Sequence, residues 1–272
     1  MDVKTNGNIS FWYADIGGIP DKRPALPGDR AADVCIIGAG YTGLWTAYYL
    51  KKANPSLDVV IVEREFAGFG ASGRNGGWLS GGFSWSREKY EKTSGRSAVV
   101  AMQNAMAGTV DEIERVTKLE GIDADLIRVD NLIAATNAAQ MERIRQEYQY
   151  ALDWQVSPER IQFLSAEQAS ARVRLANVQG AVSYRRMARV QPAKLVRGLA
   201  RVVEALGVSI FEGTTVTGFE KGRVDTDHGT VRAPVIIRAT EGFSAGLPGL
   251  ERTWLALNSA QIVTEPVPES LW

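Results

Sequence analysis

The sequence predicts an α/β fold in which helices cover a parallel sheet, and three observations lead to this class. Two apolar runs, "VCIIG" and "VVIVE", read as strands buried on both faces, because neither alternates with polar residues. The segment between them, residues 41–53, has helical composition. A second helix and strand pair follows much later, in residues 192–211. Together the first three segments form one βαβ unit of about thirty residues.

The first segments along the chain are a polar lead and this βαβ unit. Residues 1–30 contain Pro and Gly, and their one apolar patch, "SFWYAD", is expected to pack on the body of the domain. The helix of residues 41–53 ends before Pro55, which forces the chain out of the helical conformation. The strand "LDVVIVERE" then carries Glu63 at its end.

The middle of the chain predicts helices and a separate sheet. The helix of residues 97–119 has an apolar stripe with helical spacing, in which we expect even its methionines to fill the core. That stripe consists of Val99, Met102, Met106, Val110, Ile113 and Val116. A second helix spans residues 141–152, and "SAEQ", residues 165–168, has the capping-box form for a short third helix. Between the first two, "LIRVDNLIAAT" predicts one or two strands.

The last regular block returns to the first pattern. Pro192 suits the first position of a helix that ends at Gly207. A strand, "VSIF", follows, and then a meander whose hairpin turns are "EKGR" and "TDHGT". The run "VIIRAT" predicts another buried strand.

Composition excludes several classes of function. Lys plus Arg equals Asp plus Glu at 31 each, which removes the broad attraction that nucleic-acid binders use, so we expect no nucleic-acid partner. The one histidine, His228, lies in a polar turn, and this leaves no His-based metal cluster and no Ser/His/Asp or Cys/His apparatus with a well-placed base. Cys35 lies in an apolar run and is expected to be buried and inert. No basic leader precedes an apolar stretch, and no apolar run approaches the roughly 18 residues of a bilayer span, so we expect a cytoplasmic protein.

The motif "GAGYTG" places Gly38, Gly40 and Gly43 in GxGxxG spacing between a strand and a helix. The first glycine allows a tight turn, the second lets a pyrophosphate approach the backbone, and the third lets the helix pack on the strand. Glu63 stands at the end of the next strand, where an acid accepts hydrogen bonds from a ribose. Because an acid repels a 2′-phosphate, the pattern favours FAD or NAD over NADP.

The glycine-rich stretch "GFGASGRNGGWLSGG", residues 68–82, favours FAD over NAD as the predicted cofactor. A classical NAD domain continues with further βα units, whereas this chain turns at once to glycine-rich backbone. FAD is long and needs a second surface of close approach, which Ser72, the amides near Gly76 and Gly77, and the polar heads of Arg74 and Asn75 could supply. The alternative is an ordinary glycine-rich surface loop.

Five segments, taken in order, resemble the D-amino-acid-oxidase-like family of FAD-dependent amine oxidoreductases, in particular its gamma-glutamylputrescine oxidoreductase and glycine or sarcosine oxidase branches. These segments are "ADVCIIGAGYTGLWTAYYL", "VVIVERE", "GFGASGRNGGW", "MARVQPAKLVRGLARVVEALGVSIFEGTTV" and "VIIRATEGFSAGLPGL". The resemblance implies that the GxGxxG turn holds the pyrophosphate, Glu63 with Arg64 the adenosine ribose, and Val216 the adenine through its main chain. The residues that the resemblance and the motifs assign to the cofactor are Gly38, Gly40, Tyr41, Thr42, Gly43, Glu63, Arg64, Ala71, Ser72, Arg74, Asn75, Gly76, Gly77, Val216, Thr240 and Gly242.

The resemblance also implies the domain organisation. We expect an FAD-binding, Rossmann-like domain of the glutathione-reductase type with a partial α+β substrate domain. The expected ranges are a lead (1–30), the first part of the FAD-binding domain (31–96), a helical and partial substrate-domain insertion (97–185), the second part of the FAD-binding domain (186–250), and the start of the substrate sheet (251–272). Because this family continues past the strand at "IVTEPVP", we expect the chain to be a C-terminally truncated, N-terminal piece of a longer protein.

The function that the resemblance implies is oxidation of a C–N bond of an amine or amino acid by hydride transfer to flavin N5, followed by hydrolysis of the imine. Two alternatives stay open on the residues themselves. One is a flavin monooxygenase or an NAD-dependent dehydrogenase on the same fold, and the other is a fragment that binds FAD without catalysis. The catalytic residues, the particular amine, the electron acceptor and the oligomeric state are not assigned.

Overall fold

The chain divides into two units in the computed structural model, which describes residues 10–84, 86–255, 257 and 259–271. The first unit comprises Met1–Gly76, Ile122–Ala124 and Gln191–Trp272, and the second comprises Gly77–Gly121 and Asp125–Val190. The second unit begins earlier than the boundary predicted at residue 97, because the short strand β4 (Trp78–Leu79) pairs with β7 (Gly180–Arg189) inside that unit.

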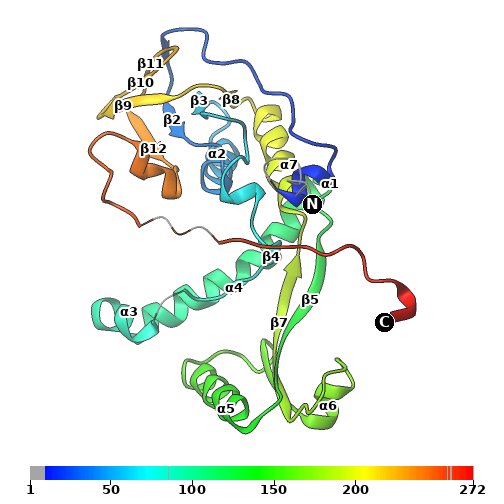
Figure 1. Cartoon of the computed structure of the whole chain (residues 1–272). Coiled ribbons are helices and arrows are strands. Elements are labelled where there is room, and N and C mark those ends of the chain that lie inside the picture. Colours follow the sequence, from blue (N-terminus) through cyan, green and yellow to red (C-terminus); the bar gives the residue numbers. More distant parts are fainter. Residues whose placement is uncertain (1–9, 85, 256, 258, 272) are drawn as a thin grey trace. The chain divides into compact units, whose positions relative to one another are not determined.

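A parallel sheet of four strands lies at the centre of the first unit, in the order β12-β2-β3-β8 (Figure 1). Its strands are β12 (Val235–Arg238), β2 (Val34–Ile37), β3 (Val59–Val62) and β8 (Ser209–Phe211). Every residue of β2 and β3 is buried, as their apolar runs predict. The prediction that "VIIRAT" is a buried strand is wrong, because β12 is the outermost strand and both of its end residues are exposed.

Two different layers cover the faces of this sheet. Helix α2 (Tyr41–Ala53) contacts β2, β3 and α7 (Pro192–Ala205). Cys35, Ile37, Val60 and Val62 alternate along their strands and share a buried cluster with the other layer. That layer is a second sheet in the order β1-β11-β10-β9, built from β1 (Arg30–Ala31), β11 (Gly229–Arg232), β10 (Arg223–Thr226) and β9 (Val216–Glu220). Helices, parallel sheet and meander thus form three layers, the predicted α/β architecture.

The N-terminal lead packs on the first unit, as the patch "SFWYAD" predicts. It forms a short helix, α1 (Phe11–Asp15), whose Tyr13 side chain is 0% exposed. The Tyr13 hydroxyl donates a hydrogen bond to the carbonyl of Gly68 at 2.9 Å, and Trp12 Nε1 donates to the carbonyl of Asn75 at 2.7 Å. These two hydrogen bonds connect helix α1 to the first half of the glycine-rich stretch.

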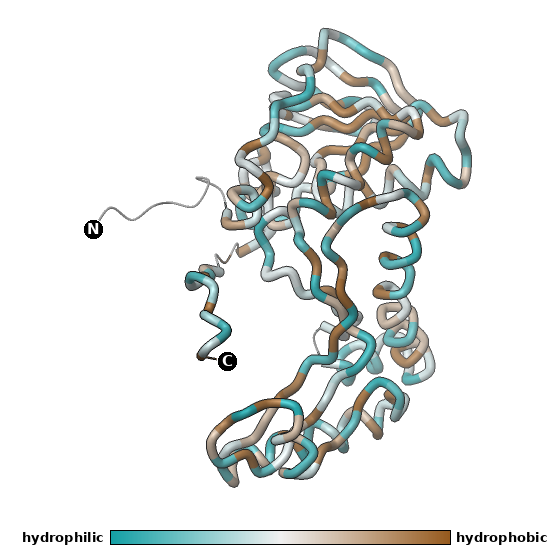
Figure 2. Tube along the Cα trace, turned by 90° about the vertical axis from the view of Figure 1, so that its right-hand side faces the viewer, coloured by the Kyte–Doolittle hydropathy of each residue, from teal (hydrophilic) through white to brown (hydrophobic). Residues whose placement is uncertain are grey.

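The second unit is built around two long antiparallel strands, β5 (Ile127–Ala135) and β7, which run side by side (Figure 1). Strand β6 (Ile161–Ser165) also pairs with β7. The helices of this unit are α3 (Arg87–Ser94), α4 (Arg96–Leu119), α5 (Ala138–Asp153) and α6 (Ala166–Ser170). Ser165 and Gln168 form the predicted capping box at the start of α6. Figure 2 shows hydrophobic residues recurring along the strands and helices of both units.

The apolar stripe predicted for α4 is only partly buried. Val99, Val110 and Val116 lie in the core, but Met102 is 55% exposed, so the prediction that it fills the core is wrong. Gln103 is buried instead, because its side-chain amide donates to the carbonyl of Trp154 and its oxygen accepts from Arg87. Gln103 can be buried because both ends of its amide have hydrogen-bond partners, whereas the hydrophobic spacing predicted burial of Met102.

The C-terminal segment follows the 3₁₀ turn Glu241–Gly246 and contains a second 3₁₀ turn, Glu269–Leu271, at its far end. The described residues of 251–272 contain no strand, so the strand predicted there is not seen. A strand requires a neighbour to share its backbone hydrogen bonds, and no described segment pairs with this one. Among the described residues, no helix has the length and apolar character to cross a membrane.

Candidate nucleotide site

The turn between β2 and α2 is shaped by its three glycines. Gly38 has φ +103°, and a Cβ there would lie 2.6 Å from the carbonyl oxygen of Ala239. A Cβ on Gly43 would lie 2.1 Å from the carbonyl oxygen of Gly38, so the helix can approach the turn only because this side chain is absent. A Cβ on Gly40 would lie 2.9 Å from Ser72 Oγ. Each glycine thus meets the requirement that the GxGxxG spacing predicts.

The N-terminus of α2 presents backbone donors to this turn. The N–H of Tyr41 donates to Ser72 Oγ at 2.9 Å. Within the described residues, the N–H groups of Thr42 and Gly43 have no hydrogen-bond partner, as is expected of the first turn of a helix. Free N–H groups and the positive end of the helix dipole together favour a phosphate.

The carboxylate of Glu63 is fixed beside this turn. Its two oxygens accept hydrogen bonds from the backbone N–H groups of Ala39 and Glu65, each at 2.9 Å. Burial raises the pKa of this carboxyl, while the two N–H donors and the Arg64 guanidinium lower it. Each carboxylate oxygen keeps further lone pairs, which could accept ribose hydroxyls.

The first part of the glycine-rich stretch lies against the GxGxxG turn. The N–H of Gly68 donates to the carbonyl of Ala39 at 3.0 Å, and Ser72 Oγ accepts from Tyr41 as above. Residues 71–73 form one turn of 3₁₀ helix that places Ser72 opposite Gly40. These two hydrogen bonds hold two segments that are distant in sequence side by side.

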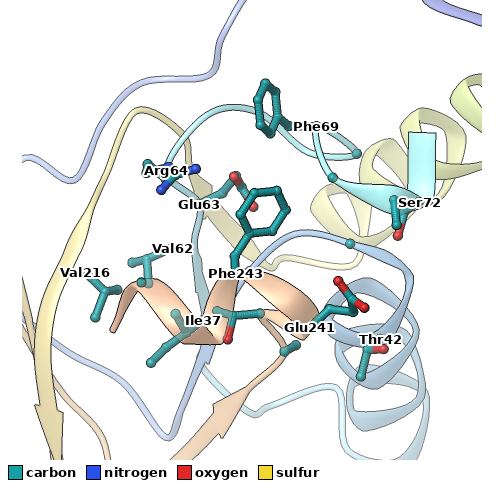
Figure 3. Close-up of a pocket in the computed structure, with 18 of the residues that line it drawn as sticks. Ile37, Thr42, Val62, Glu63, Arg64, Phe69, Ser72, Val216, Glu241 and Phe243 are labelled. Atoms are coloured by element: carbon teal, nitrogen blue, oxygen red, sulfur yellow. The ribbon is translucent and has the colours of Figure 1, made fainter. Parts of the chain in front are cut away.

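A cavity of about 200 Å³ opens between these segments (Figure 3). Its remaining wall comes from the end of β12 and the 3₁₀ turn beyond it, which contribute Thr240 and Phe243. The Arg64 guanidinium lies over the Phe243 ring, 5.4 Å from its centre. Val216 at the start of β9 completes the cavity on the side of the meander.

Ten of the sixteen residues predicted for the cofactor line this cavity. They are Gly38, Gly40, Tyr41, Thr42, Glu63, Arg64, Ala71, Ser72, Val216 and Thr240. The other six lie outside its lining, and they are Gly43, Arg74, Asn75, Gly76, Gly77 and Gly242.

Three of the six residues outside the lining make contacts within the chain instead. Arg74 stacks on the Phe69 ring at 4.4 Å and donates through Nε to the Phe69 carbonyl at 2.6 Å. Asn75 Nδ2 donates to the carbonyl of Ser72 at 3.2 Å. The carbonyl of Gly77 accepts from the N–H of Val190 at 2.9 Å. The second half of the glycine-rich stretch is therefore used for local structure, and its first half for the cavity.

The sequence reasoning missed several lining residues, above all Ile37, Val62, Phe69 and Phe243. Ile37 and Val62 could have been found, because they end β2 and β3, and ligands of open α/β sheets bind at the carboxyl ends of the strands. No local pattern indicated Phe243, which reaches the cavity through the pairing of β12 with β2.

The fold and the cavity define a dinucleotide-binding protein: a parallel sheet, a GxGxxG turn at a helix N-terminus and an acid at the end of the next strand meet at one place. The particular family follows from comparison with known proteins. Residues 33–272 match the DAO family, described as FAD dependent oxidoreductase, and the chain belongs to this family. FAD is accordingly its cofactor.

Several similar curated proteins are oxidoreductases by name. The chain is 36% identical to gamma-glutamylputrescine oxidoreductase of Escherichia coli over 115 residues, which are 42% of this chain and 26% of that protein. It is 28% identical to the probable oxidoreductase OrdL of Rhizobium meliloti over 242 residues, 87% of this chain and 55% of that protein. The chain spans about half the length of OrdL.

Similar solved structures include two enzymes whose names contain an amino-acid substrate. L-amino acid deaminase from Proteus myxofaciens aligns with a TM-score of 0.67 at 20% identity, over 86% of this chain and 50% of that one. Glycine oxidase from Geobacillus kaustophilus aligns with a TM-score of 0.62 at 24% identity, over 77% of this chain and 55% of that one. At these identities the likeness establishes the shared fold.

Proposed function

We propose that this chain is the FAD-binding part of an oxidoreductase that oxidises a C–N bond of an amine or amino acid. FAD, when bound, supplies the acceptor for a hydride from the carbon next to the amine, and water hydrolyses the resulting imine. The observation that carries the proposal is the meeting of the GxGxxG turn, Glu63 and Ser72 around one cavity.

The residues present fit the pyrophosphate of FAD. A Cβ on Gly40 would fill the space between the turn and Ser72, so the absence of a side chain leaves a cradle open there. The N–H groups of Thr42 and Gly43 donate to no described residue, so they can donate to phosphate oxygens. Because Ser72 Oγ accepts from the N–H of Tyr41, the Ser72 hydroxyl proton is free to donate to the pyrophosphate.

Other lining residues fit the adenosine part. Glu63 would accept hydrogen bonds from the ribose hydroxyls, and its position is fixed before binding by Ala39 and Glu65. Val216 would contact the adenine through its main chain. Arg64, held over Phe243, would lie beside the ribose with a guanidinium that partly balances the carboxylate.

The substrate class comes from the relatives. Gamma-glutamylputrescine oxidoreductase, glycine oxidase and L-amino acid deaminase carry amine or amino-acid substrates in their names. We therefore place the substrate of the whole protein among small amines and amino acids.

The test is anaerobic reduction of the FAD-loaded chain. A panel of primary amines, secondary amines and amino acids is added, and loss of the visible absorbance of the oxidised flavin is followed. Bleaching by one chemical group of amines is expected. If the chain holds FAD and none of the panel reduces it, the chain binds the cofactor without the proposed activity.

A further inference from the structure

A second cavity, of about 460 Å³, lies wholly within the second unit. Its walls come from the loop before α3, from α3, α4 and α5, and from the middle of β5 and β7. Four arginines and one glutamate line it, which are Arg87, Arg160, Arg185, Arg186 and Glu147. The volume falls in the range that small-molecule sites occupy in proteins, about 300–1,000 Å³.

Arg87 is held in one orientation by its surroundings. Its guanidinium lies over the rings of Phe83 and Tyr150, at 5.3 and 5.2 Å from their centres. Its Nε donates to Gln103 Oε1 at 2.7 Å, and Gln103 is itself buried and fixed by the carbonyl of Trp154. Within the described residues, the terminal Nη groups of Arg87 have no hydrogen-bond partner. The Arg87 side chain is therefore preorganised, and its Nη groups remain available as hydrogen-bond donors.

Two further arginines approach the same space. Among the described residues, the Arg160 side chain makes one hydrogen bond, a long one from Nη1 to Asn104 Oδ1 at 3.4 Å. Burial lowers the pKa of Arg160, and so do the neighbouring charges of Arg186 and Arg87. Arg186 has a left-handed backbone with φ +62°. It lies where β7 places Arg185 and Arg186 opposite the single residue Asp130, a bulge of the kind that redirects a side chain.

Acidic groups nearby offset these three arginines only in part. Glu147 lines the cavity and supplies one negative charge, while its hydrogen-bond donor is the neutral Tyr184 hydroxyl. Asp111 raises the pKa of Arg160 by its charge but is paired with Arg128, and Asp130 Oδ2 lies 3.3 Å from Arg172 Nη1 and 3.9 Å from Arg185 Nε. In the part of the chain that the structure describes, Arg87, Arg160 and Arg186 form no ion pair. The lining holds four arginines and one glutamate, so it keeps a positive charge that a bound anion would balance.

We propose that this cavity binds a small organic anion, whose carboxylate or phosphate group is held by Arg87, Arg160 and Arg186. The volume admits a molecule larger than a single inorganic ion, and the planar forks of arginine match both kinds of oxyanion. The cavity shares no lining residue with the nucleotide site, so the proposal does not depend on FAD binding.

The test is isothermal titration of the full chain with citrate at constant ionic strength, with inorganic phosphate as a second probe. We expect saturable citrate binding that Arg87→Gln and Arg160→Gln each weaken about ten- to hundredfold, since a hydrogen bond from a charged group is lost. Arg145→Gln is the matched control, because Arg145 is exposed on α5 outside the cavity and its loss changes the net charge equally. The nucleotide site is the same in all variants, so phosphate binding there cancels in the comparison.

A second measurement covers the case in which a variant fails to fold. The unaltered chain is treated with phenylglyoxal, which modifies arginines, with and without citrate, and the modified peptides are identified by mass spectrometry. Citrate is expected to protect Arg87 and Arg160 and to leave Arg145 unprotected. The proposal is overturned if neither anion binds saturably, if the control loses as much affinity as the cavity variants, or if citrate protects none of the cavity arginines.

Discussion

Replacing Gly40 by alanine separates the stability of the turn from its capacity to bind FAD. Gly40 has φ −86° and ψ −173°, an extended conformation that alanine adopts without strain. The new methyl group would lie 2.9 Å from Ser72 Oγ but 3.9 Å from Ser72 Cβ, so only the hydroxyl has to move. Moving it breaks the hydrogen bond from the N–H of Tyr41, which costs about 1 kcal/mol of unfolding free energy, as for other helix caps.

The structure predicts that this cost is not additive. Ser72→Ala alone loses the same hydrogen bond and the same ~1 kcal/mol, but it also removes the atom that the Gly40→Ala methyl would meet. Gly40→Ala in the Ser72→Ala background is therefore expected to cost almost nothing further in urea unfolding. The coupling between the two changes is about 1 kcal/mol.

Affinity for FAD follows a different pattern. The methyl occupies the cradle itself, so Gly40→Ala should weaken FAD binding about ten- to hundredfold, both alone and combined with Ser72→Ala. Quenching of flavin fluorescence on titration measures this affinity for the unaltered chain, both single variants and the double variant. Unchanged affinity in Gly40→Ala would refute the assignment of this turn to the pyrophosphate.

Three further predictions concern the support of the site. Glu212 is 1% exposed and accepts hydrogen bonds from Arg23, Arg197 and the N–H of Ala67. Glu212→Gln leaves Arg197 without its counter-charge and Arg23 with Glu204 alone, so it should lower the free energy of unfolding by about 3–5 kcal/mol in a urea titration. Tyr13→Phe removes the partner of the Gly68 carbonyl and should cost about 1–3 kcal/mol by the same measurement, with the far-UV spectrum as a check that the fold persists. Burial raises the pKa of the Cys35 thiol to about 12, so at pH 8 only about one thiol in ten thousand is ionised and a thiol reagent should label Cys35 no faster than the chain unfolds. Fast labelling under native conditions would contradict the buried position of Cys35.

The sequence predicted what is local and missed what depends on distant contacts. The strand, turn and helix around Gly38 and Gly43 follow from residue types at fixed spacing, and the structure has them as predicted. The use of the glycine-rich stretch could not be predicted in detail, because it depends on two hydrogen bonds, from Gly68 to Ala39 and from Tyr41 to Ser72. These contacts bring Ser72 to the cavity and leave the second half of the stretch outside it.

The same reason accounts for the errors in burial. An apolar run cannot show whether its strand lies at the centre or the edge of a sheet, so β12 was expected to be buried and is an edge strand. Helical spacing likewise could not indicate that Gln103 is buried in place of Met102, because the partners of Gln103 are Arg87 and the carbonyl of Trp154. That buried glutamine is also what fixes Arg87 in the second cavity.

The central claim is that the cavity between the GxGxxG turn and the Gly68–Ser72 segment holds the ADP part of FAD. Its most direct test is competition between FAD and ADP for the purified chain, followed by flavin fluorescence, with NAD and NADP titrated in parallel. The account predicts that FAD binds saturably, that ADP displaces it, and that NADP competes poorly because Glu63 repels its 2′-phosphate. Saturable binding of NAD by a chain that does not bind FAD would contradict it.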